Sequence, residues 1–289
     1  MWASYPSSIP FFERTWKQCR HGVWWMLQCV RHGKRPPVVQ VWPDMPSRQA
    51  ALYKITRQLG WELTNLKRTD AVLGIRFQDR THKDTSAIPI EMRLISPWWN
   101  VDCSDISKGT LEKAHKAAFG YGMRLDPTTH EGTLVMKSDE NAQHDGALII
   151  GPIAPDQVRE NVVYQREIDN RDNQGDYYDY RVVCVQKTFP VVYKKCKDAA
   201  RRFTNETNHV ELLGRSPFSD QEEDCMRQLA QGMNIHYGEF DALRDRTTGQ
   251  LFVVDVNPTP WGPPAQLAPE LQIEAINRMA TAFQSSLQA

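Results

Sequence analysis

The feature that most constrains the fold is a stretch near the C-terminus, residues 237–264, in which two apolar runs flank a polar turn that contains Gly249. This pattern predicts a β-hairpin. In the second run Asp255 and Asn257 stand two residues apart, so both side chains leave the same face of the strand. Asp241 lies in the first run. The hairpin therefore predicts that three oxygen-bearing side chains converge.

Oxygen ligands grouped in this way suit Mg²⁺, which usually binds through one or two carboxylates together with substrate phosphates. The simpler interpretation is that acidic residues stand at strand ends because water solvates them there. Here, however, they interrupt a β-rich run that should be largely buried, and an unpaired buried charge is costly. We therefore predict that Asp241, Asp255 and Asn257 are metal ligands.

The composition excludes several classes of function. The chain has 289 residues, enough for two or three lobes, and its 35 basic residues balance 35 acidic ones. Without a net field we expect neither nucleic acid nor membrane as a partner, and any phosphate site must be local. No run approaches the roughly 18 apolar residues of a membrane span. The first residues lack a basic segment followed by an apolar one, so we expect a cytoplasmic location.

The cysteines and histidines show no pattern typical of a metal or nucleophile site. The six cysteines are scattered without a CxxC pair, so we expect reduced structural thiols. The eight histidines lack HExxH spacing, and only His144 falls in a loop suspected of activity. A GxSxG elbow is also missing. The sequence thus shows no motif for a covalent enzyme nucleophile.

The first third of the chain alternates strand and helix signals, which predicts a small α/β lobe over residues 1–99. Its elements are two short β-forming runs and one helix, expected at residues 37–43, 71–77 and 47–60. Ser47 is the predicted helix cap and Gly60 the stop. An earlier helix is expected over residues 13–31, whose tryptophans we assign to packing; no function is assigned to this segment.

Two lysines further along are candidates for phosphate contact. Ser107 predicts the cap of a helix that begins at Lys108, where a cation opposes the helix dipole unless an anion also binds. A solvated lysine is the simpler interpretation. Lys137 leaves an apolar strand and enters a polar loop that ends at Gly146, and such a lysine can hold a nucleotide phosphate while loop amides donate further hydrogen bonds. GxxxxGK[ST] is absent, so this is not a Walker A loop.

From about residue 100 to residue 264 the chain resembles the ATP-grasp superfamily. The resemblance rests on the hairpin with Asp241 and the Asp255-x-Asn257 strand, and on the order of the residues before it. Two departures are that the family usually has Glu at the position of Asp255 and that its loop after the strand lysine is often richer in glycine. The resemblance implies that the hairpin ligands hold Mg²⁺, with Mn²⁺ as a second possibility.

The resemblance also assigns roles to the remaining candidates. It implies that Lys108 and Lys137 contact ATP. The strand that would present its backbone to adenine is formed by Gln165, Arg166, Glu167 and Ile168. Arg181, in an Asp-x-Arg run, would face the phosphates or the acyl group. Side chains flanking the γ-phosphate and the acceptor would be Lys194, Arg202 and Asn205.

The implied fold is α+β, with two α+β lobes that hold ATP between antiparallel sheets after a small α/β lobe. The expected boundaries are residues 1–99 for the N-terminal lobe, 100–168 for the central lobe and 169–289 for the C-terminal lobe with the metal hairpin. The N-terminal lobe is consistent with the family but unspecific.

The implied activity is ATP-dependent ligation. A carboxylate is activated as an acyl phosphate, ADP leaves, and an amine or, less often, a thiol attacks. The expected partners are small-molecule or peptide carboxylates and amines, and the oligomeric state is not indicated. A kinase with a hydroxyl acceptor would share every residue named. The residues are also compatible with a nucleotide-binding pseudoenzyme or interaction module and, less readily, with a non-enzymatic α/β binding protein.

Overall fold

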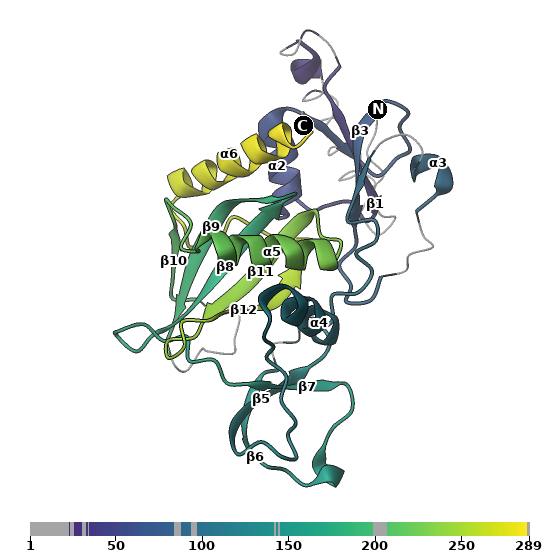
Figure 1. Cartoon of the computed structure of the whole chain (residues 1–289). Coiled ribbons are helices and arrows are strands. Elements are labelled where there is room, and N and C mark those ends of the chain that lie inside the picture. Colours follow the sequence, from purple (N-terminus) through teal and green to yellow (C-terminus); the bar gives the residue numbers. More distant parts are fainter. Residues whose placement is uncertain are drawn as a thin grey trace, which may run out of the picture.

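A computed structural model describes residues 23, 26–30, 33, 35–83, 88–93, 97–141, 143, 145–198 and 207–287. Arg202, Asn205 and His144 lie outside the described residues, as does most of the helix expected over residues 13–31. The described residues form three sheets, of four, five and three strands. Figure 1 shows the three-stranded sheet at one end of the molecule and the N-terminal sheet at the other, with the five-stranded sheet between them.

The N-terminal sheet is parallel and has the order β2-β1-β3-β4. Its strands are β1 (Val38–Pro43), β2 (Glu62–Thr64), β3 (Ala71–Phe77) and β4 (Trp98–Trp99), and its helices are α2 (Ala51–Leu59) and the short α3 (Ile90–Arg93). Helix α2 ends at Gly60, whose φ of 70° is readily accessible to glycine. The helix begins later than expected, because Ser47 lies in a turn before it and the capping position is Ala50.

The three-stranded sheet is antiparallel and has the order β6-β5-β7. Its strands are β5 (Gly132–Ser138), β6 (Ala147–Gly151) and β7 (Val162–Arg166), with a short 3₁₀ turn, η2 (Pro155–Gln157), before β7. Helix α4 (Lys108–Phe119) precedes it, and the side chain of Ser107 accepts the N-terminal hydrogen bond of that helix from Thr110, as its sequence position predicts. The loop after β5 is tied to this helix, because Asp139 accepts a 2.7 Å hydrogen bond from the amide of Gly109.

The five-stranded sheet is antiparallel and has the order β10-β9-β8-β11-β12. Its strands are β8 (Tyr177–Val185), β9 (Thr188–Lys197), β10 (His209–Leu212), β11 (Tyr237–Arg244) and β12 (Leu251–Asn257). The turn between β8 and β9 is formed by Gln186 and Lys187, and Gln186 has a positive φ of 54°. Helix α5 (Asp220–Gly232) begins with the capping box that Ser219 and Glu222 predict.

Helices cover both faces of the five-stranded sheet. On one face α5 packs against Val182, Phe240 and Ala242. On the other, α6 (Pro269–Ser285) packs between this sheet and α2, so its Phe283 shares a core with residues of the N-terminal sheet. Figure 1 shows α6 crossing one end of the strands and leaving the other end uncovered on that side. Among the described residues no helix is both long and apolar enough to cross a membrane.

Candidate active site

On one face of the five-stranded sheet, the side chains change from apolar to polar along the strands. Because alternate residues of a strand share a face, Arg181 of β8 lies on the same face as Val183 and Val185, which are packed beneath α6. The same alternation holds in β11, where Tyr237 is packed in that core and Asp241 lies beyond it. Beyond the edge of α6, polar side chains therefore replace the apolar ones.

The polar end of this face lines a cavity of about 860 Å³. The opposite wall comes from the three-stranded sheet and α4, with Lys137 and Lys108, and a third side comes from the N-terminal region and from residues 261–266. Nine of the predicted site residues line this one cavity: Lys108, Lys137, Gln165, Arg166, Ile168, Arg181, Asp241, Asp255 and Asn257. The geometry therefore brings most of the candidates together.

Asp241 and Asp255 are direct partners across the β11–β12 hairpin. Glu239 and Asn257 form the next pair on the same face, because each lies two residues from an aspartate of the first pair. A register shift follows Asp241, where β12 carries one extra residue. The hairpin thus presents four oxygen-bearing side chains to the cavity, whereas its sequence pattern indicated three.

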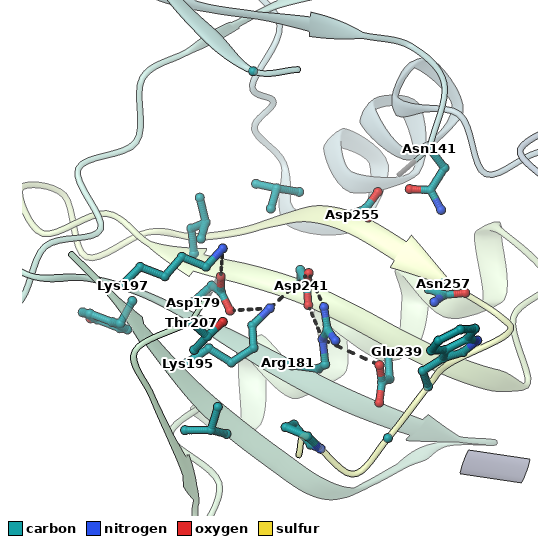
Figure 2. A pocket seen from close by; sticks show the side chains of 18 of the residues that line it. Asn141, Asp179, Arg181, Lys195, Lys197, Thr207, Glu239, Asp241, Asp255 and Asn257 are labelled. Atoms are coloured by element: carbon teal, nitrogen blue, oxygen red, sulfur yellow. Dashed lines mark hydrogen bonds and ion pairs between the residues drawn. The ribbon is translucent and has the colours of Figure 1, made fainter. Parts of the chain in front are cut away.

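Asp241 is held by cations on β8 and β9 of the same sheet (Figure 2). Arg181 donates hydrogen bonds of 2.9 and 3.0 Å to its two carboxylate oxygens, and Lys195 lies 3.6 Å away. Lys195 also contacts Asp179 at 2.9 Å. Burial opposes ionisation, but Arg181 and Lys195 outweigh it and hold the pKa of Asp241 well below its usual range. Asp241 is therefore ionised at neutral pH.

Asp255 has a different environment although it pairs with Asp241. Burial raises the pKa of Asp255 to about 6, opposed by Lys108, while the negative charge of Asp241 adds to the increase. Its Oδ1 atom is buried and has no hydrogen-bond partner among the described residues. A buried carboxylate oxygen without a partner is costly unless a ligand completes it. Asp255 is thus the member of the hairpin set best suited to receive a cation.

Glu239 was not identified from the sequence. Its side chain is 5% exposed, and its ion-pair contact with Arg181 is 3.6 Å long. Burial raises its pKa to about 7, with Arg181 acting in the opposite direction. The signal that could have revealed it is the spacing from Asp241, since a residue two positions earlier on the same strand shares its face.

Asn257 belongs to the turn that leaves β12. Its Oδ1 accepts hydrogen bonds from the backbone amide and the hydroxyl of Thr259, at 2.8 and 2.9 Å. In the part of the chain that the structure describes, no three His, Cys, Asp or Glu side chains form a ready-made metal site. The hairpin alone is therefore not a closed cage, which agrees with an ion that takes its remaining oxygens from phosphates and water.

The lysines on the facing wall lie in two distinct environments. Burial lowers the pKa of Lys137 to about 8, and the charge of Lys108 acts in the same direction while Asp255 opposes it. Lys108 donates a 2.8 Å hydrogen bond from Nζ to the backbone carbonyl of Glu140. Both cations thus face the acidic hairpin across the cavity, at the N-terminal end of α4 and near the end of β5.

The strand predicted to face adenine is only partly at the cavity. Gln165, Arg166 and Ile168 line it, and Glu167 does not. Ile168 shares a small apolar cluster with Met123 and Phe252. The cavity lining includes the apolar side chains of Val135, Ile168, Leu243 and Val254 as well as the polar ones of Gln165 and Arg166, a mixture that suits a flat ring with polar edges.

Lys194 lies on the other face of the five-stranded sheet. Its ammonium group is 4.6 Å from the ring centroid of Tyr178, and it does not line the cavity. Its neighbour Lys195 and, two residues further, Lys197 line the cavity instead. The reason is the alternation of side chains along β9: in a run of consecutive basic residues, composition does not say which of them face inward.

Comparison with known proteins gives structural similarity alone. No family model matches the sequence, and no curated protein matches it. Among solved structures, VanG D-Ala:D-Ser ligase from Enterococcus faecalis aligns with a TM-score of 0.56 at 8% identity, covering 88% of this chain and 100% of that one. The ATP-grasp ligase PsnB, complexed with a minimal precursor, gives 0.53 at 13% identity, covering 84% and 99%.

D-alanine–D-alanine ligase from Bacillus anthracis, complexed with ATP, aligns with a TM-score of 0.51 at 10% identity, covering 88% of this chain and 99% of that chain. These alignments span nearly the whole of the solved chains. The chain has the ATP-grasp fold, with two antiparallel sheets after a parallel N-terminal one, as the resemblance implied.

Proposed function

We propose that the protein is an ATP- and Mg²⁺-dependent ligase that activates a carboxylate as an acyl phosphate, releases ADP and joins the acyl group to an amine. The fold supports ATP-dependent ligation in general, since the structural neighbours are ATP-grasp ligases. The finer assignment rests on the residues at the cavity. Identities of 8–13% do not carry a reaction from one protein to another.

The observation that carries the proposal is the pairing of Asp241 with Asp255, one buried oxygen of which has no hydrogen-bond partner in the part of the chain that the structure describes. Two carboxylates that lie close together repel unless a cation lies between them or one is protonated. Mg²⁺ bound by Asp255, Asp241 and Asn257 would supply that cation, neutralise phosphate charge and orient the terminal phosphate for transfer. The donor set, two carboxylates and one amide oxygen, fits a hard divalent ion.

The cations around the cavity would offset the charge that develops during phosphoryl transfer. Lys137 would bind phosphate oxygens from the central sheet, and Arg181 and Lys195 would act from the opposite wall. Asp241 already holds the guanidinium group of Arg181 in place. Arg181 therefore needs little reorganisation when negative charge develops on the transferred phosphoryl group. The substrate carboxylate attacks the terminal phosphorus, the bond to the ADP oxygen breaks, and the amine then displaces phosphate from the acyl carbon.

The acceptor would bind at the end of the cavity formed by Gln49, Lys54 and residues 261–266. Trp261 is 63% exposed there, and Lys54 donates a 2.8 Å hydrogen bond to the carbonyl of Gly262. PsnB is described in complex with a precursor peptide and the Enterococcus enzyme as a ligase of D-Ala and D-Ser. We therefore include both peptides and small amino acids among the candidate substrates.

The test is ADP release from purified protein with MgATP, measured across pools of carboxylates and amines by a coupled assay. We expect release above background only when an acid and an amine are both present, and mass spectrometry should detect an amide product. Asp255→Asn should abolish the release, whereas Asp156→Asn, an exposed aspartate in η2, should leave it unchanged. A phosphorylated alcohol as the product would contradict the ligase assignment in favour of a kinase.

A further inference from the structure

A second groove, of about 620 Å³, lies beside β7. It is separate from the candidate active site, because Tyr164 lines the groove while the next residue, Gln165, lines the active-site cavity. Val162 and Tyr164 of β7 line the groove, whereas Gln165 and Arg166 at the end of that strand line the active-site cavity, and the groove and the cavity share no lining residue. The groove is bounded on one side by α4 and on the other by residues 122–127 and 158–164.

Four cationic side chains line this groove. Lys113 and Lys116 come from α4, where a spacing of three residues places them on one face of the helix, and Arg124 and Arg159 come from the opposite side. All four are exposed. Within the described part of the chain, none of them makes an ion pair within 4 Å. Their charges are therefore available to a partner.

The two acidic residues of the groove are already engaged. Glu112 accepts hydrogen bonds from the backbone amides of Met123 and Arg124, at 2.9 and 3.1 Å. Asp126 accepts bonds from the amide and hydroxyl of Thr128 through one oxygen. These bonds fix both carboxylates in place. Four cations against two carboxylates leave the groove positive on a chain whose formal net charge is zero.

We propose that this groove is a docking site for an acidic peptide segment bound in an extended conformation. Side chains of an extended strand alternate in direction, so glutamates or aspartates on such a segment reach both charged walls in turn. The guanidinium groups of Arg124 and Arg159 can each bind a carboxylate through two donors. Val158, an exposed apolar side chain at the rim, offers a contact for an intervening apolar residue.

A peptide fits these observations better than a nucleic acid. Nucleic-acid sites carry a basic stripe that follows the phosphate backbone beyond one groove, and the whole chain has equal numbers of acidic and basic residues. The fixed carboxylates of Glu112 and Asp126 would also repel a continuous phosphate backbone, whereas a peptide that also has uncharged residues can place these beside them.

The experiment is fluorescence anisotropy of the full chain with a short fluorescein-labelled peptide that repeats two adjacent Glu and two adjacent Ala, so that Glu side chains point to both walls. ATP is left out, so that the result does not depend on the proposed enzymatic function. We expect saturable binding that weakens as salt rises from low to physiological concentration. Lys116→Glu combined with Arg159→Glu, one reversal on each wall, should weaken binding by roughly tenfold or more. Lys67→Glu, an exposed reversal in the N-terminal region, should leave it unchanged.

Thermal melting of each variant shows whether it is folded, and the neutral pair Lys116→Gln with Arg159→Gln provides a milder change at the same positions. Equal binding by wild type and the groove variants would overturn the proposal, as would absence of saturable binding at low salt. A single-stranded oligonucleotide of equal charge that bound the groove more tightly than the peptide would replace the peptide assignment with a nucleic-acid one.

Discussion

Asp241 and Asp255 pair across the β11–β12 hairpin, yet their protonation equilibria are shifted in opposite directions. Arg181 and Lys195 hold Asp241 in the charged form, while burial and the charge of Asp241 itself raise the pKa of Asp255 to about 6. Asp241 thus has protein cations as partners, whereas Asp255 has a buried oxygen that no described residue hydrogen-bonds. Substitutions at the two positions should therefore have opposite effects on stability.

Asp255→Asn should stabilise the protein in the absence of nucleotide, because it removes a buried charge. A folded-state pKa near 6, against an ordinary value of 3.8, means that the folded protein holds the extra proton between these pH values. Stability of the wild type therefore falls as pH rises through this window and then stays at the lower level. We expect a gain of roughly 1–2 kcal/mol at pH 8 and almost none near pH 4, measured by urea unfolding.

Asp241→Asn should have the opposite effect. Its carboxylate accepts two hydrogen bonds from Arg181. The substitution removes this negative charge and leaves the partly buried guanidinium group of Arg181 without its main ion-pair partner. Because the pKa of Asp241 is depressed, its contribution is present above the unfolded pKa and lost as pH falls through the folded one. We expect a loss of about 2 kcal/mol at pH 7 by urea unfolding. If Asp241→Asn and Asp255→Asn changed the free energy of unfolding in the same direction, the predicted difference between the two aspartates would be contradicted.

The adjacent lysines of β9 provide a matched pair. Lys195 lines the cavity and contacts Asp179 and Asp241, whereas Lys194 lies over the ring of Tyr178 on the other face. Lys195→Gln should lower kcat for ADP release by about 10-fold or more, since a positioned cation stabilises developing charge. Lys194→Gln should change kcat by less than about twofold. Equal effects of the two substitutions on kcat would contradict a role that depends on which face of β9 the lysine occupies.

Lys137→Gln should weaken MgATP binding with little change in stability. Burial lowers the pKa of this lysine to about 8, so the charged form is disfavoured without an anion, and loss of the charge costs the empty protein little. We expect the Kd for MgATP to rise by about 10- to 100-fold, measured by isothermal titration calorimetry. An unchanged Kd would remove Lys137 from the nucleotide site.

The hairpin was predictable because its signals are local. Two β-forming runs separated by a turn with Gly249 determine both the strands and the faces of Asp255 and Asn257. The helix caps at Ser107 and Ser219 were predictable for the same reason, since a capping residue binds amides only two or three positions away. The prediction for Ser47 was wrong because its turn is followed by an uncapped helix start at Ala50.

The remaining features of the site depend on tertiary structure. Which lysine of the basic run after Tyr193 faces the cavity follows from the pairing of β9 with β8, and composition does not determine it. Glu239 is recognised as a residue of the site only from its pairing with Asn257 across the hairpin. The pairing of Arg181 with Asp241 joins strands that are 60 residues apart in sequence. These relationships become visible only when strands that are distant in sequence are aligned.

The most direct test of the metal site is calorimetric titration of the wild type, Asp255→Asn and Asp156→Asn with ATP, each in the presence and absence of Mg²⁺. We predict Mg²⁺-dependent ATP binding by the wild type and by Asp156→Asn, and a loss of the Mg²⁺ dependence in Asp255→Asn. Equal Mg²⁺-dependent binding by all three proteins would contradict the assignment of the metal to the paired aspartates of β11 and β12.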